Sequence, residues 1–151
     1  MLAPQEIRTY FITSTTASRR RIFQVDRNSE LFLQILRENR AKNRIQLHAF
    51  VVMPDHVHLL LTPAPETSLE KAMQYIKGGF SFKLKSSFDV WDKSYTNHRI
   101  VDTEDYQRHL TYIEQNPVRD RLVQDARSFP FSSARFALDP MPDHFLQTTR
   151  G

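Results

Sequence analysis

The chain of 151 residues has the length and the balance of apolar and charged residues of one globular domain. It has no cysteine and only 3 glycines, which excludes disulfide frameworks, thiolate metal sites and phosphate-binding loops built on spaced glycines. The formal net charge of +4 suits a polyanionic partner. We expect a cytoplasmic protein with no membrane segment, because the absence of cysteine fits a reducing compartment and the apolar runs are too short to cross a bilayer.

The first half of the chain alternates apolar runs with one helical pattern. β-branched and aromatic residues gather near the start, and a Pro-Asp turn separates two later apolar runs. Between these regions, apolar residues recur every three or four positions, as on the buried face of a helix. In chain order, the patterns predict a strand at residues 7–15, a helix at 26–42, and a hairpin of strands at 45–53 and 56–62.

Capping signals and prolines divide the second half. Thr67 and Glu70 have the spacing of a capping box, so a helix is expected to open at Thr67. Pro117 is expected to end a later helix, because the residue before a proline avoids helical backbone. The expected elements are therefore a helix from Thr67, a strand within residues 88–101, a helix from Asp102 to Pro117, and a polar tail from residue 118.

This order of elements predicts the fold class. Strand, helix, strand, strand, helix, strand is the β-α-β-β-α-β order of an α+β, ferredoxin-like split sandwich. Its antiparallel sheet would carry the two helices of this unit on one face. The helix that contains Tyr112 and the C-terminal tail are additions to that unit, and the other face of the sheet or its rim is left for function.

Two histidines mark a candidate metal site. His56 and His58 are two residues apart on a predicted strand, so both imidazoles project from the same face. Two adjacent imidazoles can hold one divalent metal ion and leave coordination positions open for a substrate. The alternative is a pair of neutral histidines that are hydrogen-bonded at a sheet edge, and both interpretations fit the spacing.

The last predicted helix carries a second candidate group. Tyr106, Leu110 and Ile113 form its apolar stripe, whereas Tyr112 and Asn116 share a polar face one turn apart. A tyrosine and an amide in this arrangement can bring a phenolic oxygen and a carbonyl oxygen to one metal ion or phosphate. The alternative is that Tyr112 only borders the core, with its hydroxyl group in water.

Two sequence blocks carry a family resemblance. Residues 50–61 read FVVMPDHVHLLL and residues 112–119 read YIEQNPVR. Together they resemble the REP-associated tyrosine transposases, a branch of the single-tyrosine, HUH-type transposases found with bacterial insertion sequences. The similarity extends from the first strand to about Val123, which implies a catalytic domain at residues 1–123 and a tail at residues 124–151.

The resemblance implies a reaction and its residues. Such enzymes cut and rejoin single-stranded DNA next to hairpins through a covalent 5′-phosphotyrosine. By this resemblance, His56, His58 and Asn116 would hold Mg²⁺ or Mn²⁺, and Tyr112 would be the nucleophile. Asn116 stands where many insertion-sequence relatives carry glutamine, and Asp55 stands where asparagine is frequent.

The expected partner is single-stranded DNA with hairpin structure, and the resemblance leaves both a monomer and a homodimer open. His109, one turn before Tyr112, is a candidate base for the phenolic proton. The residues expected to contact DNA phosphates are Arg19, Arg20, Arg21, Lys77 and Lys83. Two other functions are considered: a non-cleaving hairpin-binding protein on the same fold, and a ferredoxin-like RNA-binding domain.

Overall fold

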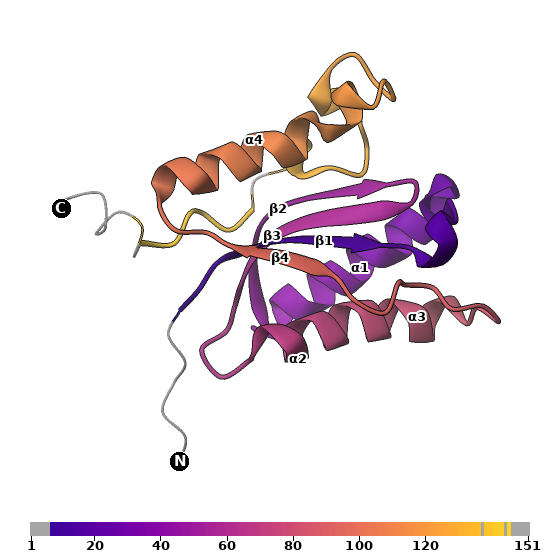
Figure 1. The fold of residues 1–151 in the computed structure, drawn as a ribbon, viewed down its shortest axis with the longest axis horizontal. Helices are drawn as coiled ribbons and strands as arrows, with labels where there is room; N and C mark the ends of the chain where they lie inside the picture. Colours follow the sequence, from indigo (N-terminus) through magenta and orange to yellow (C-terminus); the bar gives the residue numbers. More distant parts are fainter. Residues whose placement is uncertain (1–6, 137, 144, 146–151) are drawn as a thin grey trace.

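The computed structural model describes residues 7–136, 138–143 and 145, and it has a four-stranded antiparallel sheet in the order β2-β3-β1-β4 (Figure 1). The strands are β1 (Tyr10–Thr15), β2 (Ile45–Met53), β3 (His56–Pro63) and β4 (Thr96–Arg99). The helices are α1 (Asp26–Ala41), α2 (Leu69–Met73), α3 (Gly79–Leu84) and α4 (Thr103–Arg119). This strand order confirms the predicted ferredoxin-like α+β fold.

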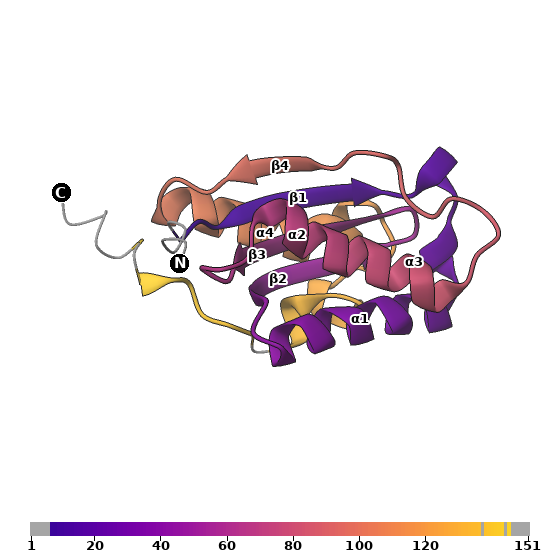
Figure 2. The ribbon, with the colours of Figure 1, turned by 90° about the horizontal axis from the view of Figure 1, so that it is seen from below.

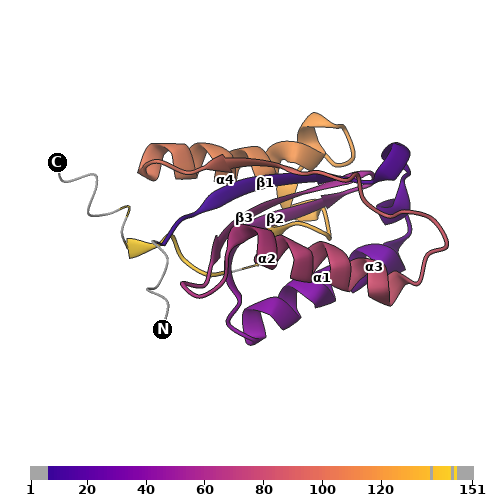
Figure 3. The ribbon, with the colours of Figure 1, turned by 60° about the horizontal axis from the view of Figure 1, so that its bottom comes forward.

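Helices cover both faces of the sheet. The α1, α2 and α3 helices lie on one face and α4 lies on the other, as Figures 2 and 3 show from two sides. The core beneath α1 to α3 includes Phe32 and Phe80, and the core beneath α4 includes Leu60 and Ile113, all fully buried. The sheet is therefore the middle layer, and α4 covers the face that the sequence left for function.

The second helical region begins one residue later than predicted. Ser68, not Thr67, caps α2, because its side chain accepts a hydrogen bond from the backbone N–H of Lys71 at 3.1 Å. Thr67 belongs to the preceding turn, where its N–H donates to the carbonyl of Ala64 at 2.8 Å. After α2 the backbone passes through a π-helical turn, Gln74–Gly78, into α3. The capping-box prediction was therefore wrong in register although the helix exists.

The α4 helix does not end at Pro117. Asp102 caps its first turn as predicted, but Pro117 lies inside the helix, which continues to Arg119. Pro117 removes its own N–H donor, but helical hydrogen bonding continues across it, since the N–H of Asp120 reaches the carbonyl of Asn116 at 3.0 Å. As a result, Asn116 is held in regular helix beside the proline.

Part of the expected polar tail is packed against the sheet. Residues 131–133 follow the outer side of β2, where the carbonyl of Phe131 accepts from the N–H of Val52 at 2.9 Å. The hydroxyl of Ser133 accepts from the N–H of Phe50 at 2.9 Å and donates to the carbonyl of the same residue at 3.1 Å. This segment closes an edge strand that would otherwise present unpaired backbone groups.

The ends of the two predicted domains, residues 1–6 and 146–151, lie outside the described residues. Within the described part of the chain, no helix combines the length and the apolar character that a membrane span requires.

Candidate active site

The two histidines of β3 face α4. Alternate residues of β3 point to opposite faces, so Leu59 packs in the core of α1 to α3 whereas Leu60 packs beneath α4. His58 shares the α4 side with Leu60, and the rings of His56 and His58 have centroids 4.8 Å apart. The strand therefore brings both imidazoles together on one face, as the spacing predicted.

Neighbouring side chains orient both rings through their Nδ1 atoms. Nδ1 of His58 lies 2.9 Å from the hydroxyl of Thr13 on β1, and Nδ1 of His56 lies 2.8 Å from a carboxylate oxygen of Asp55. The other carboxylate oxygen of Asp55 accepts from Nε of Arg19 at 3.0 Å. With Nδ1 engaged in each ring, Nε2 is the nitrogen that can coordinate a metal ion.

Burial and charge set the protonation of this group. Burial, assisted by the charges of His56 and Arg119, lowers the pKa of His58 to about 3, so its ring is neutral near pH 7 and can act as a ligand. Partial burial pushes the pKa of Asp55 upward, but His56 and Arg19 outweigh it and the net shift is downward. Asp55 is therefore an ionised acceptor that holds His56 in place.

Tyr112 on α4 reaches the same place from the opposite side. Its ring meets the ring of His58 edge-on, with centroids 5.5 Å apart, and it also meets Phe11 of β1 at 5.8 Å. The guanidinium of Arg119 lies 4.0 Å from the centre of the Tyr112 ring and donates to the Tyr112 carbonyl at 2.9 Å. Tyr106, the other tyrosine of α4, is buried, and burial raises its pKa to about 12.

Asn116 lies one turn beyond Tyr112 and is buried. Its side-chain oxygen Oδ1 has no hydrogen-bond partner among the described residues. A buried carbonyl oxygen without a partner is costly, and a divalent metal ion would satisfy it. The amide oxygen is a ligand type that suits Mg²⁺ and Mn²⁺, and two imidazoles can contribute to a divalent metal site, so these residues fit a divalent metal ion.

The predicted basic residues do not form one patch. Arg19 and Arg21 line a pocket of about 360 Å³ together with His56 and Asp120, so these two arginines adjoin His56. The guanidinium of Arg20 is turned instead to the ring of Phe88, at 4.6 Å.

The two predicted lysines belong to the layer on the opposite face of the sheet. Lys77 lies in the π-helical turn between α2 and α3, where its Nζ donates to the carbonyl of Asp92 at 3.2 Å and burial lowers its pKa. Lys83 is exposed on α3. The sequence therefore identified two basic residues beside the histidines and three elsewhere.

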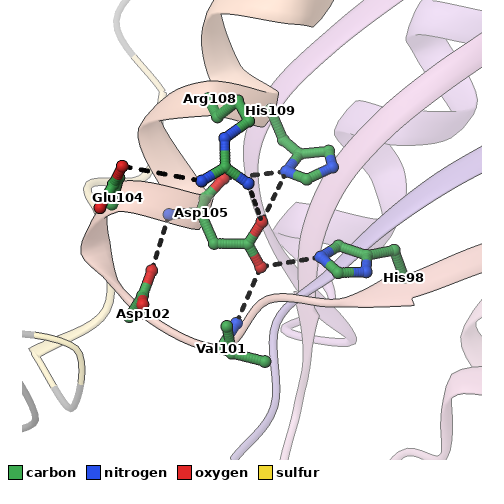
Figure 4. Close-up of polar contacts among 7 residues, drawn as sticks. All are labelled: His98, Val101, Asp102, Glu104, Asp105, Arg108 and His109. Carbon is green, nitrogen blue, oxygen red and sulfur yellow. Dashed lines mark hydrogen bonds and ion pairs between the residues drawn. The ribbon is translucent and has the colours of Figure 1, made fainter.

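A third group lies between β4 and the start of α4. His98, Asp105 and His109 place metal-ligating atoms within 4.8 Å of one another (Figure 4). Of these three residues, only His109 is a functional candidate from the sequence. The spacing of Asp105 and His109, four residues apart on a helix, is a sequence signal that was not used for their contact, whereas His98 is brought in by the register of a short strand that no periodicity revealed.

Comparisons with known proteins show the family of this chain. The family model for "Transposase IS200 like" matches residues 7–116. The chain is 28% identical over 126 residues to the REP-associated tyrosine transposase of Escherichia coli, covering 83% of this chain and 75% of that protein. It is 30% identical over 71 residues to the ISDra2 transposase TnpA of Deinococcus radiodurans, covering 40% and 51%.

A solved structure of a REP-associated tyrosine transposase bound to a REP hairpin is similar throughout. The TM-score is 0.75 at 26% identity, and the match covers 93% of this chain and 87% of that one. The predicted resemblance is therefore confirmed by sequence and by fold. The chain belongs to the IS200-like transposase family, and it is a transposase similar to the REP-associated tyrosine branch.

Proposed function

We propose that the protein cuts and rejoins single-stranded DNA next to hairpins, with Tyr112 as the nucleophile and with His56, His58 and Asn116 as ligands of Mg²⁺ or Mn²⁺. The observation that carries this proposal is the contact between the rings of Tyr112 and His58. It joins a phenol to a neutral, metal-competent imidazole within one chain. Oδ1 of Asn116, one turn further on and without a hydrogen-bond partner among the residues that the structure describes, supports the same assignment.

The covalent step balances without a further reactant. The hydroxyl of Tyr112 loses its proton as its oxygen attacks the scissile phosphorus, the bond to the 3′ oxygen breaks, and that oxygen takes up a proton, so no net proton is gained or lost. The products are a 5′-phosphotyrosine and a free 3′-hydroxyl. Attack by a second 3′-hydroxyl reverses the step, releases the tyrosine and joins the two strands, so no ATP is needed. When bound, the metal ion would polarise the phosphate and offset its charge.

Two arginines are suited to guide the strand to this point. Arg19 and Arg21 line the pocket beside His56, where phosphate groups on a single strand can be neutralised. Arg119, which stacks on the ring of Tyr112, adds a third positive charge. DNA contacts by Arg20, Lys77 and Lys83 stay predictions.

Hairpin DNA is the substrate class that we assign. The similar solved protein is bound to a REP hairpin, and the match covers most of both chains. In this chain Tyr112 and His58 already meet within one copy, so the reaction as proposed does not require a second copy. Since its substrate is cellular DNA, we place the reaction in the cytoplasm.

The test is a denaturing gel with labelled hairpin oligonucleotides that carry single-stranded flanks from the repeats around this protein's own gene. The protein is incubated with Mn²⁺ or with chelator, beside Tyr112→Phe and the control Tyr75→Phe, whose ring packs on Arg44 in the opposite layer. We expect a covalent adduct that requires both metal and Tyr112 and that persists in Tyr75→Phe. An adduct in Tyr112→Phe would move the nucleophile elsewhere. Tight hairpin binding with no covalent adduct in the presence of any metal ion tested would favour the alternative function, a hairpin-binding protein that does not cleave DNA.

A further inference from the structure

The carboxylate of Asp105 joins β4 to the first turns of α4 (Figure 4). Oδ2 accepts from Nε2 of His98 at 2.7 Å and from the backbone N–H of Val101 at 3.0 Å. Oδ1 lies 3.1 Å from Nδ1 of His109 and accepts from Arg108 at 3.4 Å. This buried carboxylate therefore has partners on a strand, on the loop that follows it, and on its own helix.

A column of rings leads from this carboxylate to the candidate metal site. The rings of His98 and His109 are stacked with centroids 4.7 Å apart, and His109 lies 4.7 Å from Phe11. Phe11 in turn is stacked on His58 at 5.3 Å, and the ring of Tyr112 meets both Phe11 and His58. The side chains of three strands and α4 thus form one continuous set of contacts.

We propose that Asp105 is a positioning residue that, through His98 and His109, fixes α4 on the sheet so that Tyr112 stays against His58. The inference rests on the proposed function for the role of Tyr112. Asp105 precedes Tyr112 by two turns of α4, about 10 Å along the axis, so it acts through the helix and the rings and not on the DNA. A shift of the helix by one ångström would separate nucleophile from phosphate.

The carboxylate carries its charge in this position. Burial pushes the pKa of Asp105 upward, but the hydrogen bonds from His98 and Val101 and the charges of His98 and His109 outweigh it, so the net shift is downward. An ionised acceptor with several donors makes stronger hydrogen bonds than a neutral one. The carboxylate is therefore ionised at neutral pH, where the reaction is expected to run.

Hydrogen bonding explains the cluster better than a bound metal does. Both oxygens of Asp105 already accept from other donors, namely Val101 and Arg108. Nδ1 of His109 also lies 2.9 Å from the Asp105 carbonyl, which is the contact of a protonated nitrogen. A protonated imidazole nitrogen does not coordinate a metal ion. Nδ1 of His109 therefore belongs to this network, whereas Nε2 is the ring nitrogen that can accept a proton, and the role of His109 as a base for Tyr112 stays a prediction.

The test compares four variants of the full chain. Asp105→Asn and His98→Ala break the network, His98→Gln keeps an N–H donor, and Glu104→Gln removes an exposed carboxylate of the same turn, 3.8 Å from Arg108, as the matched control. In single-turnover adduct formation, we expect Asp105→Asn and His98→Ala to be slower by about 10²-fold with unchanged hairpin affinity. His98→Gln should recover most of the rate, and Glu104→Gln should match the unchanged protein.

A second readout does not depend on activity. In protein labelled at its 6 histidines, the imidazole NMR signals of His58 report its stacking on Phe11. We expect these signals to shift in Asp105→Asn and His98→Ala but not in Glu104→Gln. If neither the unchanged protein nor any variant forms an adduct, the proposed function fails. A shift of the His58 signals in Asp105→Asn and His98→Ala would still support the positioning role of Asp105.

Two results would overturn the inference. The first is an Asp105→Asn protein that forms the adduct at the normal rate or keeps the His58 signals unchanged. The second is one-to-one binding of Zn²⁺ by the His56→Ala/His58→Ala protein that disappears when Asp105→Asn is added, because the cluster would then be a metal site. The milder His98→Gln variant keeps the comparison valid if His98→Ala does not fold.

Discussion

The rings of Tyr112 and His58 meet edge to face, at an interplanar angle of 73°. An edge-to-face pair of this kind is favourable for neutral rings, and burial keeps His58 neutral. The same neutral ring is the form that binds a metal ion. One physical cause, the burial of β3 beneath α4, therefore supports both the packing of the tyrosine helix and the chemistry assigned to it.

Replacing Asn116 should affect metal binding more than folding. Asn39 is a matched control, because it is also a buried helical amide, but it donates to the Ile35 carbonyl at 2.8 Å and accepts from Arg44 at 3.2 Å. We expect Asn39→Ala to lower the free energy of unfolding by about 1–3 kcal/mol and Asn116→Ala to lower it less, since Oδ1 of Asn116 has no hydrogen-bond partner to lose in the described part of the chain.

Titration calorimetry with Mn²⁺ completes this comparison. Affinity should fall in Asn116→Ala and stay unchanged in Asn39→Ala. Equal Mn²⁺ affinity in the two variants would remove Asn116 from the ligand set.

Replacing Asp55 should weaken the metal site through His56. Asp55→Ala removes the partner of the His56 ring, and a loss of this kind typically lowers metal affinity by about 10–100-fold. Arg19→Gln breaks only the outer ion pair with Asp55 and leaves the His56 contact, so its effect on Mn²⁺ affinity should be smaller. Calorimetry measures the loss of Mn²⁺ affinity in each variant. A larger loss in Arg19→Gln than in Asp55→Ala would contradict the prediction.

Acid should destabilise the protein through His48. Burial lowers the pKa of His48, against the opposing effect of Asp139. The unfolded chain takes up a proton near its ordinary pKa of about 6.5, whereas the folded chain does so only at lower pH, so the stability that neutral His48 contributes is present above that value and is lost as the pH falls.

Urea unfolding between about pH 7 and about pH 5 measures this loss. The decrease in the free energy of unfolding should be smaller in His48→Gln than in the unchanged protein. If the free energy of unfolding falls equally with pH in the two proteins, His48 does not cause the loss of stability.

Ser133→Ala should destabilise the edge of the sheet. The change leaves the N–H and the carbonyl of Phe50 without their side-chain partner in a buried place, which costs about 1–3 kcal/mol. Ser128→Ala, at an exposed position of the same segment, should be nearly neutral. Chemical denaturation measures the free energy of unfolding of both variants. A Ser133→Ala protein as stable as the unchanged protein would mean that the hydrogen bonds of Ser133 contribute little to stability.

Short-range patterns predicted much of the fold and, within the site, the grouping of residues on each element. Alternation along a strand placed His56 and His58 on one face, and helical spacing separated Tyr112 from its apolar stripe. That these two groups meet depends on how α4 crosses the sheet, which local patterns do not encode, and the family resemblance supplied that step. His98 was missed because β4 has four residues, all exposed, and so carries no periodic signal.

Local rules also failed where tertiary contacts competed with them. Thr67 and Ser68 can both cap a helix, and the position of the first buried residue, Leu69, decides between them. Pro117 is accepted inside α4 because hydrogen bonding resumes beyond it. The segment around Ser133 reads as polar, yet its hydroxyl pairs with backbone groups of β2.

The histidines and the tyrosine belong to elements of different resistance to local opening. His56 and His58 lie on β3, which is hydrogen-bonded to a neighbour on each side, whereas α4 is a separate layer held to the sheet by its side chains. Fluctuations that lift α4 can therefore occur without unfolding the strand. Natural variation at the underside of α4 can tune how often Tyr112 is in place while the affinity for metal stays the same, so turnover and metal binding can evolve independently in this chain.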